Sequence, residues 1–200
     1  MISYEPAKGH PFAHDPFKAL VAPRPIGWIS TLSASGAVNL APYSYFNAVG
    51  DRPPMVMFSS TGWKDSVGNI AETGEFVCNI VGKAFAEAMN ATSAPFPPDV
   101  NEFEAAGLEA EASMKVAPPR VKGIPAALEC VAVRQFPLSD RLGQETGNHV
   151  VFGEVVAVHI DEAFMIGGRF DTARAGLLAR CGYMDYAVAD TLFQMGRPRV

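Results

Sequence analysis

Short runs of apolar residues, separated by Gly, Pro, Asn and Asp, dominate the pattern along the chain. Runs rich in Val, Ile and Phe with such boundaries are typical of β-strands. The pattern predicts strands at 26–32, 55–60, 75–81, 127–136 and 149–160. A turn at 33–36 leads into a further run at 39–49, and a second turn follows at 50–54. The first half of the chain is therefore expected to form an antiparallel meander.

Helical patterns are few and short. They predict helices at 65–73, 83–91 and 102–106. Asp65 or Ser66 is expected to cap the first helix and Gly74 to end it, because Asp and Ser favour N-caps and Gly favours the position after a helix. In the second helix Phe85 and Met89 are four residues apart, so they share one face.

Proline is frequent between 92 and 125, which predicts a long excursion over the surface. Ordered loops of this length often cover a site. We predict one domain over residues 1–200, with its core at about 20–186 and a C-terminal tail at 187–200. The predicted fold class is mainly β, a closed or Greek-key antiparallel barrel with a few short α-helices.

Composition narrows the class of protein. Gly and Pro together make up 34 of the 200 residues, while 48% of residues are apolar and 18% are charged. Such a chain is too apolar for intrinsic disorder and too rich in Gly and Pro for a coiled coil. The net charge of −5 provides no basic surface for nucleic acid or for an anionic membrane. Neither partner is expected.

The compartment is predicted from three further features. No apolar stretch approaches the length of a membrane span, and the first 18 residues lack the basic start and apolar middle of a signal peptide. Cys78, Cys130 and Cys181 form no CxxC pair and stand among apolar or small residues. Buried free thiols in a reducing cytoplasm are the favoured interpretation.

The loop after the second predicted strand carries candidate chemistry. Residues 59–69 (SSTGWKDSVGN) combine Ser59, Ser60, Lys64 and Ser66 with two glycines ahead of a predicted helix start. Free N–H groups at a helix start attract a phosphate, hydroxyls donate to its oxygens, and a lysine neutralises its charge. An ordinary polar loop with Ser and Asp as caps is the alternative. The segment is not a Walker A loop.

A second candidate feature joins two predicted strands. Ser30 and Thr31 face the aromatic run at 39–47, an arrangement that can form a flat slot with polar rims for a planar cofactor. Core aromatics with polar residues at strand edges are the alternative. Pro42 within the run indicates an edge strand or a bulge, where backbone groups become free for a ligand.

The histidines and the common catalytic motifs give little further evidence of a site. His10 and His14 are four residues apart, but the segment is broken by prolines, so metal binding is not expected. His149 follows Gly147 and Asn148 at a strand start and could lie at the rim of a site. No GxSxG, HExxH or GxGxxG motif occurs. An enzyme of this sequence would therefore take its reactive centre from a cofactor.

Several segments resemble the flavin reductase-like, FMN-binding split-barrel family, which includes reductase components of two-component monooxygenases and flavoredoxin-like proteins. The matching segments are APRPIGWIST at 22–31, NLAPYSYFN at 39–47, PPMVMFSS at 53–60, KDS at 64–66, NI at 69–70, EFVCN at 75–79, LEC at 128–130, GEV at 153–155 and RCGY at 180–183. The family's Lys-Asp-Thr is Lys64-Asp65-Ser66 here, which keeps the hydroxyl. The resemblance covers roughly 20–186 and implies a split β-barrel.

The resemblance also implies a homodimer with FMN bound near the subunit interface. Two groups of residues would then contact the cofactor. The isoalloxazine and ribityl chain would be lined by Ser30, Thr31, Ala41, Pro42, Tyr43 and Ser44. The phosphate would be held by Ser59, Ser60, Lys64 and Ser66, with Asn47 and Asn69 as supports. His149 is similar to a histidine that, in some relatives, lies near the nicotinamide side of the flavin.

The implied activity is NAD(P)H:flavin reductase. NADH or NADPH would transfer a hydride to FMN, and reduced flavin or its electrons would pass to a partner monooxygenase or another acceptor. One alternative is an FMN-binding electron-transfer protein, flavoredoxin-like, without direct NAD(P)H turnover. Another is a split barrel that has lost flavin and binds a different anionic ligand.

Overall fold

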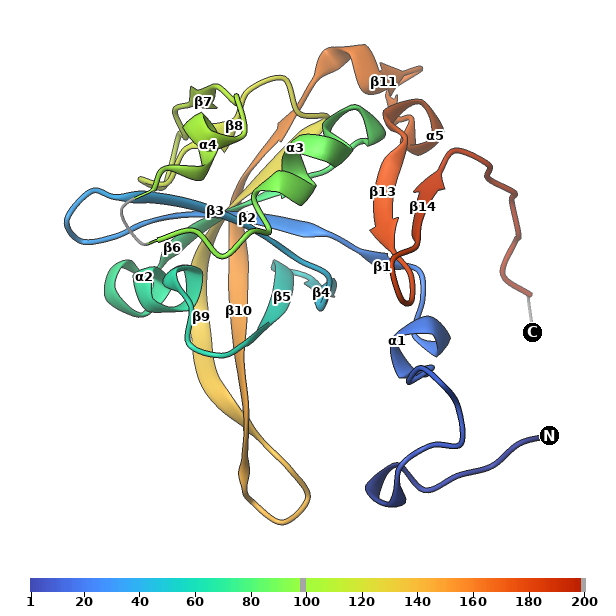
Figure 1. Cartoon of the computed structure of the whole chain (residues 1–200). Coiled ribbons are helices and arrows are strands. Elements are labelled where there is room, and N and C mark those ends of the chain that lie inside the picture. Colours follow the sequence, from blue (N-terminus) through green and yellow to red (C-terminus); the bar gives the residue numbers. More distant parts are fainter. Residues whose placement is uncertain (98–99, 199–200) are drawn as a thin grey trace.

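The computed structural model describes residues 1–97 and 100–198 and contains one large antiparallel sheet (Figure 1). Its strands, in spatial order, are β3 (Val38–Tyr43), β2 (Gly27–Leu32), β6 (Glu75–Ile80), β9 (Ala126–Ser139), β10 (Glu145–Ile160), β5 (Pro54–Thr61) and β4 (Phe46–Asp51). Every predicted strand is present. β9 and β10 extend beyond their predicted ends as a long hairpin that projects from the barrel (Figure 1).

The predicted meander is wrong in its order. β2 pairs with β3 and β4 pairs with β5, but β3 and β4 lie at opposite edges of the sheet although only Ser44 and Tyr45 separate them. The sheet curls, so that β3 approaches β5, and the Ser59 N–H donates to the Tyr45 carbonyl at 2.8 Å. The two edges therefore meet without pairing, and this is the split of a split barrel.

Two apolar clusters form the core. The cluster in the barrel contains Ile29, Phe46, Phe58 and Phe76, all buried. Gly153 of β10 allows Phe76 to pack there, because a Cβ at this position would lie 2.3 Å from the Phe76 ring. The second cluster lies on the opposite face of the sheet.

The predicted excursion supplies much of the second cluster. Phe103, Val116, Val121 and Ile124 are buried against Trp28 and other residues of the sheet. Its local elements are α4 (Glu102–Ala105), β7 (Ala110–Glu111) and β8 (Arg120–Val121), and α3 (Ala86–Ala91) leads into it. The prediction of a surface excursion is thus incomplete, since this segment is a packed layer (Figure 1). Residues 98–99 of the excursion and 199–200 of the tail lie outside the described residues.

A buried carboxylate fixes part of this layer. The carboxylate of Glu129, on β9, accepts hydrogen bonds from the backbone N–H groups of Met114, Lys115 and Val116 and contacts Nε2 of His159. Burial acts to raise the pKa of Glu129, but the hydrogen bonds from Met114, His159 and Lys115 outweigh it and hold this pKa below its usual value. Glu129 therefore joins the layer to the barrel as an ionised group.

A smaller sheet lies beside the barrel. It orders β1 (Arg24–Pro25), β13 (Leu177–Arg180) and β14 (Tyr186–Ala189). The Arg24 guanidinium is buried and donates to the carbonyls of Lys18, Val21 and Cys181, so it joins the N-terminal segment to this sheet. The remaining elements are η1 (Pro6–Lys8), α1 (Phe17–Leu20), α2 (Asp65–Thr73), η2 (Lys83–Phe85), η3 (Glu162–Phe164), β11 (Met165–Ile166), β12 (Arg169–Phe170) and α5 (Thr172–Ala175).

The predicted helices are present with changed details. Residues 83–91 are a 3-10 turn, η2, followed by α3, and the predicted helix at 102–106 is α4. Gly74 ends α2 in the left-handed conformation, with φ 73°, as predicted. Cys78 and Cys130 are buried as predicted, whereas Cys181 is half-buried, and all three are free. No helix in the described part of the chain is long and apolar enough to cross a membrane.

Candidate functional site

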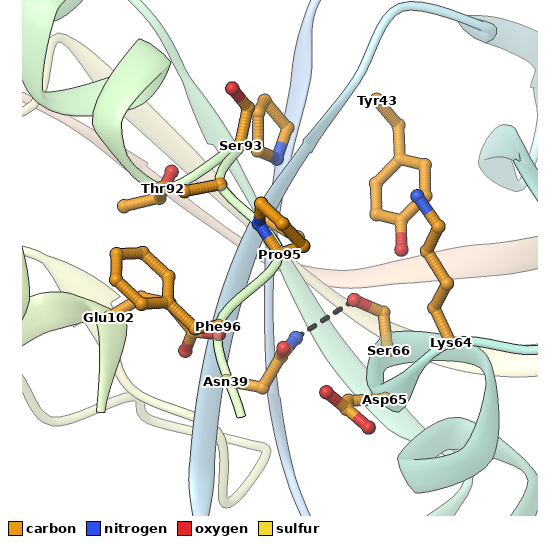
Figure 2. Close-up of a pocket in the computed structure, with 13 residues that line it drawn as sticks. Asn39, Tyr43, Lys64, Asp65, Ser66, Thr92, Ser93, Pro95, Phe96 and Glu102 are labelled. Atoms are coloured by element: carbon orange, nitrogen blue, oxygen red, sulfur yellow. Dashed lines mark hydrogen bonds between the residues drawn. The ribbon is translucent and has the colours of Figure 1, made fainter. Parts of the chain in front are cut away.

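A cavity of about 410 Å³ lies along the free edge of β3 (Figure 2). This volume falls within the ordinary range for small-molecule sites. Three segments form its walls: residues 39–43 of β3, residues 64–66 at the start of α2, and residues 92–96 with Glu102 from the packed layer. Figure 2 shows Glu102 and Phe96 on the opposite side of the cavity from Lys64.

The start of α2 faces this cavity without a side-chain cap. Lys64 is the N-cap residue and makes no side-chain capping hydrogen bond. The first helical hydrogen bond runs from the Gly68 N–H to the Lys64 carbonyl at 2.9 Å. The N–H groups of residues 65–67 therefore have no helical acceptor. The predicted cap at Asp65 or Ser66 is wrong, because the N-cap is Lys64, whose backbone is extended, and Asp65 is already the first helical residue.

A hydrogen-bond network fixes the Ser66 hydroxyl at this helix start. Asn69 and Asn39 both donate to Thr31 Oγ1, at 3.0 and 3.3 Å. Asn39 also donates to Ser66 Oγ at 2.8 Å, the hydrogen bond that Figure 2 shows as a dashed line. Since Ser66 Oγ accepts from Asn39, its own hydrogen remains available for a ligand. Thr31 and Asn69 act on Ser66 through Asn39 and do not line the cavity.

The Tyr43 hydroxyl is buried and lacks a hydrogen-bond partner among the described residues. Figure 2 shows it pointing toward Ser66. The neighbouring Ser60 donates instead to the Gly62 carbonyl at 3.0 Å. Burial raises the pKa of Tyr43, against smaller opposite effects of the Ser66 and Ser60 hydroxyls. Tyr43 is therefore a protonated donor, and an unpaired buried donor is costly enough to indicate a missing acceptor.

The opposite wall is fixed to the barrel. The buried Glu102 carboxylate accepts from the Leu40 N–H at 3.0 Å, at the free edge of β3. Burial raises the pKa of Glu102, and the nearby Asp65 carboxylate adds to the increase. Thr92 Oγ1 accepts from the Trp28 indole at 2.9 Å, which holds the other end of this wall.

The predicted site residues fall into two groups. Five of them line the cavity: Ala41, Pro42, Tyr43, Lys64 and Ser66. The others do not line it: Ser30, Thr31, Ser44, Asn47, Ser59, Ser60, Asn69 and His149. Ser44 lines two adjoining cavities, and Asn47 lines one of them. Ser30 is buried and donates to the Pro119 carbonyl at 2.5 Å, so its hydroxyl holds the packed layer.

The histidines lie away from the cavity. His149 pairs with Ser60 across β10 and β5, and its ring contacts Trp63 edge-on with centroids 5.1 Å apart. His10 packs against Phe12, and His14 packs against Tyr183. His149 is thus close to the loop that precedes α2, and its predicted place beside a nicotinamide stays a prediction.

Sequence reasoning missed several lining residues. They are Asn39, Asp65, Thr92, Ser93, Ala94, Pro95, Phe96 and Glu102. Asn39 had a detectable signal, because an Asn on an otherwise apolar strand needs a buried partner. Glu102 had none, since a single Glu at a helix start also occurs as an ordinary solvated residue.

The arrangement suits a dianionic phosphate group. Backbone N–H groups, two hydroxyls and the Lys64 ammonium meet at the start of α2, the positive end of its dipole. The cavity continues from there along β3, whose free edge includes Pro42, a residue without an N–H. A phosphate monoester with an elongated organic part fits this donor set.

A family model, a relative in sequence and solved structures all relate this chain to the same group of proteins. Residues 20–173 match the family described as flavin reductase like domain. An uncharacterized protein of Aquifex aeolicus is 42% identical over 151 residues, which are 73% of this chain and 74% of that protein. Nitrilotriacetate monooxygenase component B from Bacillus cereus is 31% identical, covers 98% of both chains and superposes with a TM-score of 0.87.

A split-barrel protein of the flavin reductase type from Shewanella frigidimarina is 25% identical. The likeness covers 91% of this chain and 90% of that one, with a TM-score of 0.81. The unpaired edges of the barrel and the similarity in sequence indicate the same family. The chain belongs to the flavin reductase-like family and has the split-barrel fold.

Proposed function

We propose that this protein is an NAD(P)H:flavin reductase that binds FMN in the cavity along β3. The observation that carries the proposal is the uncapped start of α2, which faces the unpaired hydroxyl of Tyr43. Both features place hydrogen-bond donors without acceptors in one cavity. A phosphate group supplies the acceptors that these donors lack.

Several residues of the cavity then have a defined role toward the cofactor. Lys64 neutralises the phosphate, while the Ser66 hydroxyl, the Tyr43 hydroxyl and the first N–H groups of α2 donate to its oxygens. The ribityl chain follows 41–44 along the free edge of β3. When bound, FMN would supply the redox chemistry, the uptake of a hydride from NADH or NADPH and the transfer of electrons to an acceptor. The protein contributes binding and alignment.

The electron acceptor is proposed from a relative. The similar protein from Bacillus cereus is named as component B of a monooxygenase. We therefore propose that this chain supplies reduced flavin or its electrons to a flavin-dependent monooxygenase or another acceptor. We also propose a homodimer with FMN bound near the subunit interface, as the family resemblance implies, and a cytoplasmic location, which keeps the three thiols reduced.

The test starts from the purified full-length protein. Its absorption spectrum should show bound flavin, or acquire a flavin spectrum at micromolar FMN. NADH or NADPH should then be oxidised in a flavin-dependent manner. Absence of flavin binding would exclude the proposal. Bound FMN that ignores both nicotinamides but accepts electrons from a reduced donor would identify an electron-transfer protein instead. His149→Ala tests the predicted nicotinamide contact through KM for NAD(P)H.

The phosphate contact has its own variant. Lys64→Ala should weaken FMN binding on the order of tenfold, the effect of one charge-assisted hydrogen bond, and should leave riboflavin binding unchanged. Riboflavin lacks the phosphate and reports on the ring and ribityl contacts alone. Lys83→Ala, an exposed lysine at the start of η2 that does not line the cavity, is the control. Equal losses for FMN and riboflavin would remove the phosphate role of Lys64.

A further inference from the structure

A second cavity continues the first beyond Pro42. It has a volume of about 240 Å³ and shares Pro42 and Ser93 with the first cavity. Its other polar side chains come from Ser44, Asn90, Arg180 and Tyr186. Because they share Pro42 and Ser93, the two cavities adjoin, and we treat them as one groove that runs from Lys64 along the edge of β3 to Arg180 and Tyr186 of the small sheet.

Arg180 occupies the far end of this groove in a fixed position. It is the last residue of β13, paired with Arg24 on one side and Tyr186 on the other. Its guanidinium lies over the Tyr186 ring, 4.4 Å from the centroid, and donates through Nη2 to the Tyr183 carbonyl. Tyr183 has a φ of 55°, the left-handed region that non-glycine residues rarely adopt. A strained turn therefore holds the cation in place.

The charge of Arg180 is not compensated within the described residues. Arg180 forms no ion pair there, and its Nε and Nη1 groups donate to no acceptor in that part of the chain. A fork-shaped cation that is fixed, half-buried and partly unpaired suits a planar group with neighbouring oxygen and nitrogen acceptors.

The length of the groove identifies which part of the ligand reaches Arg180. Asn39 contacts Ser66, which is proposed to bind the phosphate, and the four steps along the strand from Asn39 to Tyr43 advance about 13 Å. Ser44 follows in the second cavity. An extended FMN anchored by its phosphate at Lys64 thus brings its ring to the Arg180 end.

We infer that Arg180 binds the pyrimidine edge of the flavin ring, at N1 and the C2 carbonyl, and so favours the reduced cofactor. This inference rests on the proposed function. Two-electron reduction of a flavin at neutral pH concentrates negative charge at N1 and the C2 carbonyl, and a fixed cation stabilises this charge more than the neutral oxidised ring. Arg180 is therefore a residue that tunes the cofactor, distinct in role from Lys64, which binds its phosphate.

The experiment compares oxidised and reduced FMN on the full-length protein. Binding of oxidised FMN is followed by flavin fluorescence, and the potential of the bound flavin by anaerobic reduction with a reference dye. Arg180→Met should weaken reduced FMN on the order of tenfold more than oxidised FMN, which lowers the two-electron potential by about 30 mV. The loss of affinity should be equal for riboflavin and FMN, because both carry the ring.

Two further variants complete the test. Arg180→Lys keeps the charge and should retain most of the potential, which separates the charge from a general change of fold. Arg134→Met is the matched control, since Arg134 also lies over an aromatic ring, that of Phe136, but lines neither cavity. If wild-type protein binds no FMN, the proposed function fails. If it binds FMN and Arg180→Met has the wild-type potential, the inference about Arg180 fails alone.

Discussion

The unpaired hydroxyl of Tyr43 leads to a prediction with two effects of opposite sign. Tyr43→Phe should stabilise the ligand-free protein and, at the same time, weaken FMN binding. The phenyl ring keeps its packing against Phe58, 4.7 Å away between centroids, and against the rest of the barrel cluster. Only the hydroxyl is lost, and this hydroxyl is buried without a partner in the described structure.

The magnitudes follow from the position of the hydroxyl. A buried polar group without a partner costs about 1–3 kcal/mol, so its removal should raise the free energy of unfolding of the ligand-free protein by about 1 kcal/mol. For a chain of this size that is roughly 2–4 °C in Tm. A hydrogen bond to a charged group contributes about 1.5–3 kcal/mol, so the dissociation constant for FMN should rise at least about tenfold.

Urea unfolding of the ligand-free protein and fluorescence titration with FMN and riboflavin measure both effects. Riboflavin affinity should not change, because the hydroxyl is expected to donate to the phosphate. Tyr4→Phe, in the N-terminal segment where Tyr4 packs against Phe12, is the control and should change neither quantity. A ligand-free Tyr43→Phe protein less stable than wild type would show that the hydroxyl has a partner within the protein. Unchanged FMN affinity would show that it does not serve the ligand.

Two predictions concern the barrel itself. Because the pKa of Glu129 is lowered on folding, its contribution to stability is complete above the ordinary glutamate pKa of about 4.3 and is lost as the pH falls through the lowered value. Glu129→Gln should lower the free energy of unfolding in urea at pH 7 by about 3 kcal/mol, since an amide donor then faces backbone donors. The variant should also lose stability less steeply than wild type as the pH falls. An unchanged fall in stability at acid pH would show that Glu129 does not cause it. Gly153→Ala should destabilise by about 1–3 kcal/mol, because its methyl group would meet the Phe76 ring, whereas Gly196→Ala, with nothing within 4 Å, should be neutral.

The interior strands were predictable because their patterning is strong. β2, β5 and β6 deviate by at most one residue at either end from the predicted ranges. The ends of β9 and β10 were not predictable, since Pro137 and Gly147 are residues that usually interrupt strands. Both lie within the projecting hairpin, where Pro137 pairs opposite His149 beside a register shift. A hairpin that leaves the barrel needs no apolar alternation, and so it leaves little signal in the sequence.

The loop that we propose to bind the phosphate could be singled out from its residue types, but the role of each hydroxyl could not be predicted. Ser30 and Ser60 are satisfied by backbone carbonyls, while Tyr43 is not satisfied at all. In the sequence all three are polar groups on predicted strands. Only the hydrogen-bond partners separate a hydroxyl that holds the fold from one that waits for a ligand, and those partners come from distant segments such as Pro119.

The packed layer links the cavity to the core through two consecutive residues. Glu102 lines the cavity and holds the Leu40 N–H, while Phe103 is buried in the second apolar cluster. Displacing this part of the wall would therefore expose Phe103, at a cost of about 1.5–3 kcal/mol for an apolar side chain of this size. Ser93 and Pro95, in contrast, are exposed. Ligand entry past 93–95 leaves the core intact, so we expect the Glu102 end of the wall to stay closed while the Ser93 end admits the cofactor.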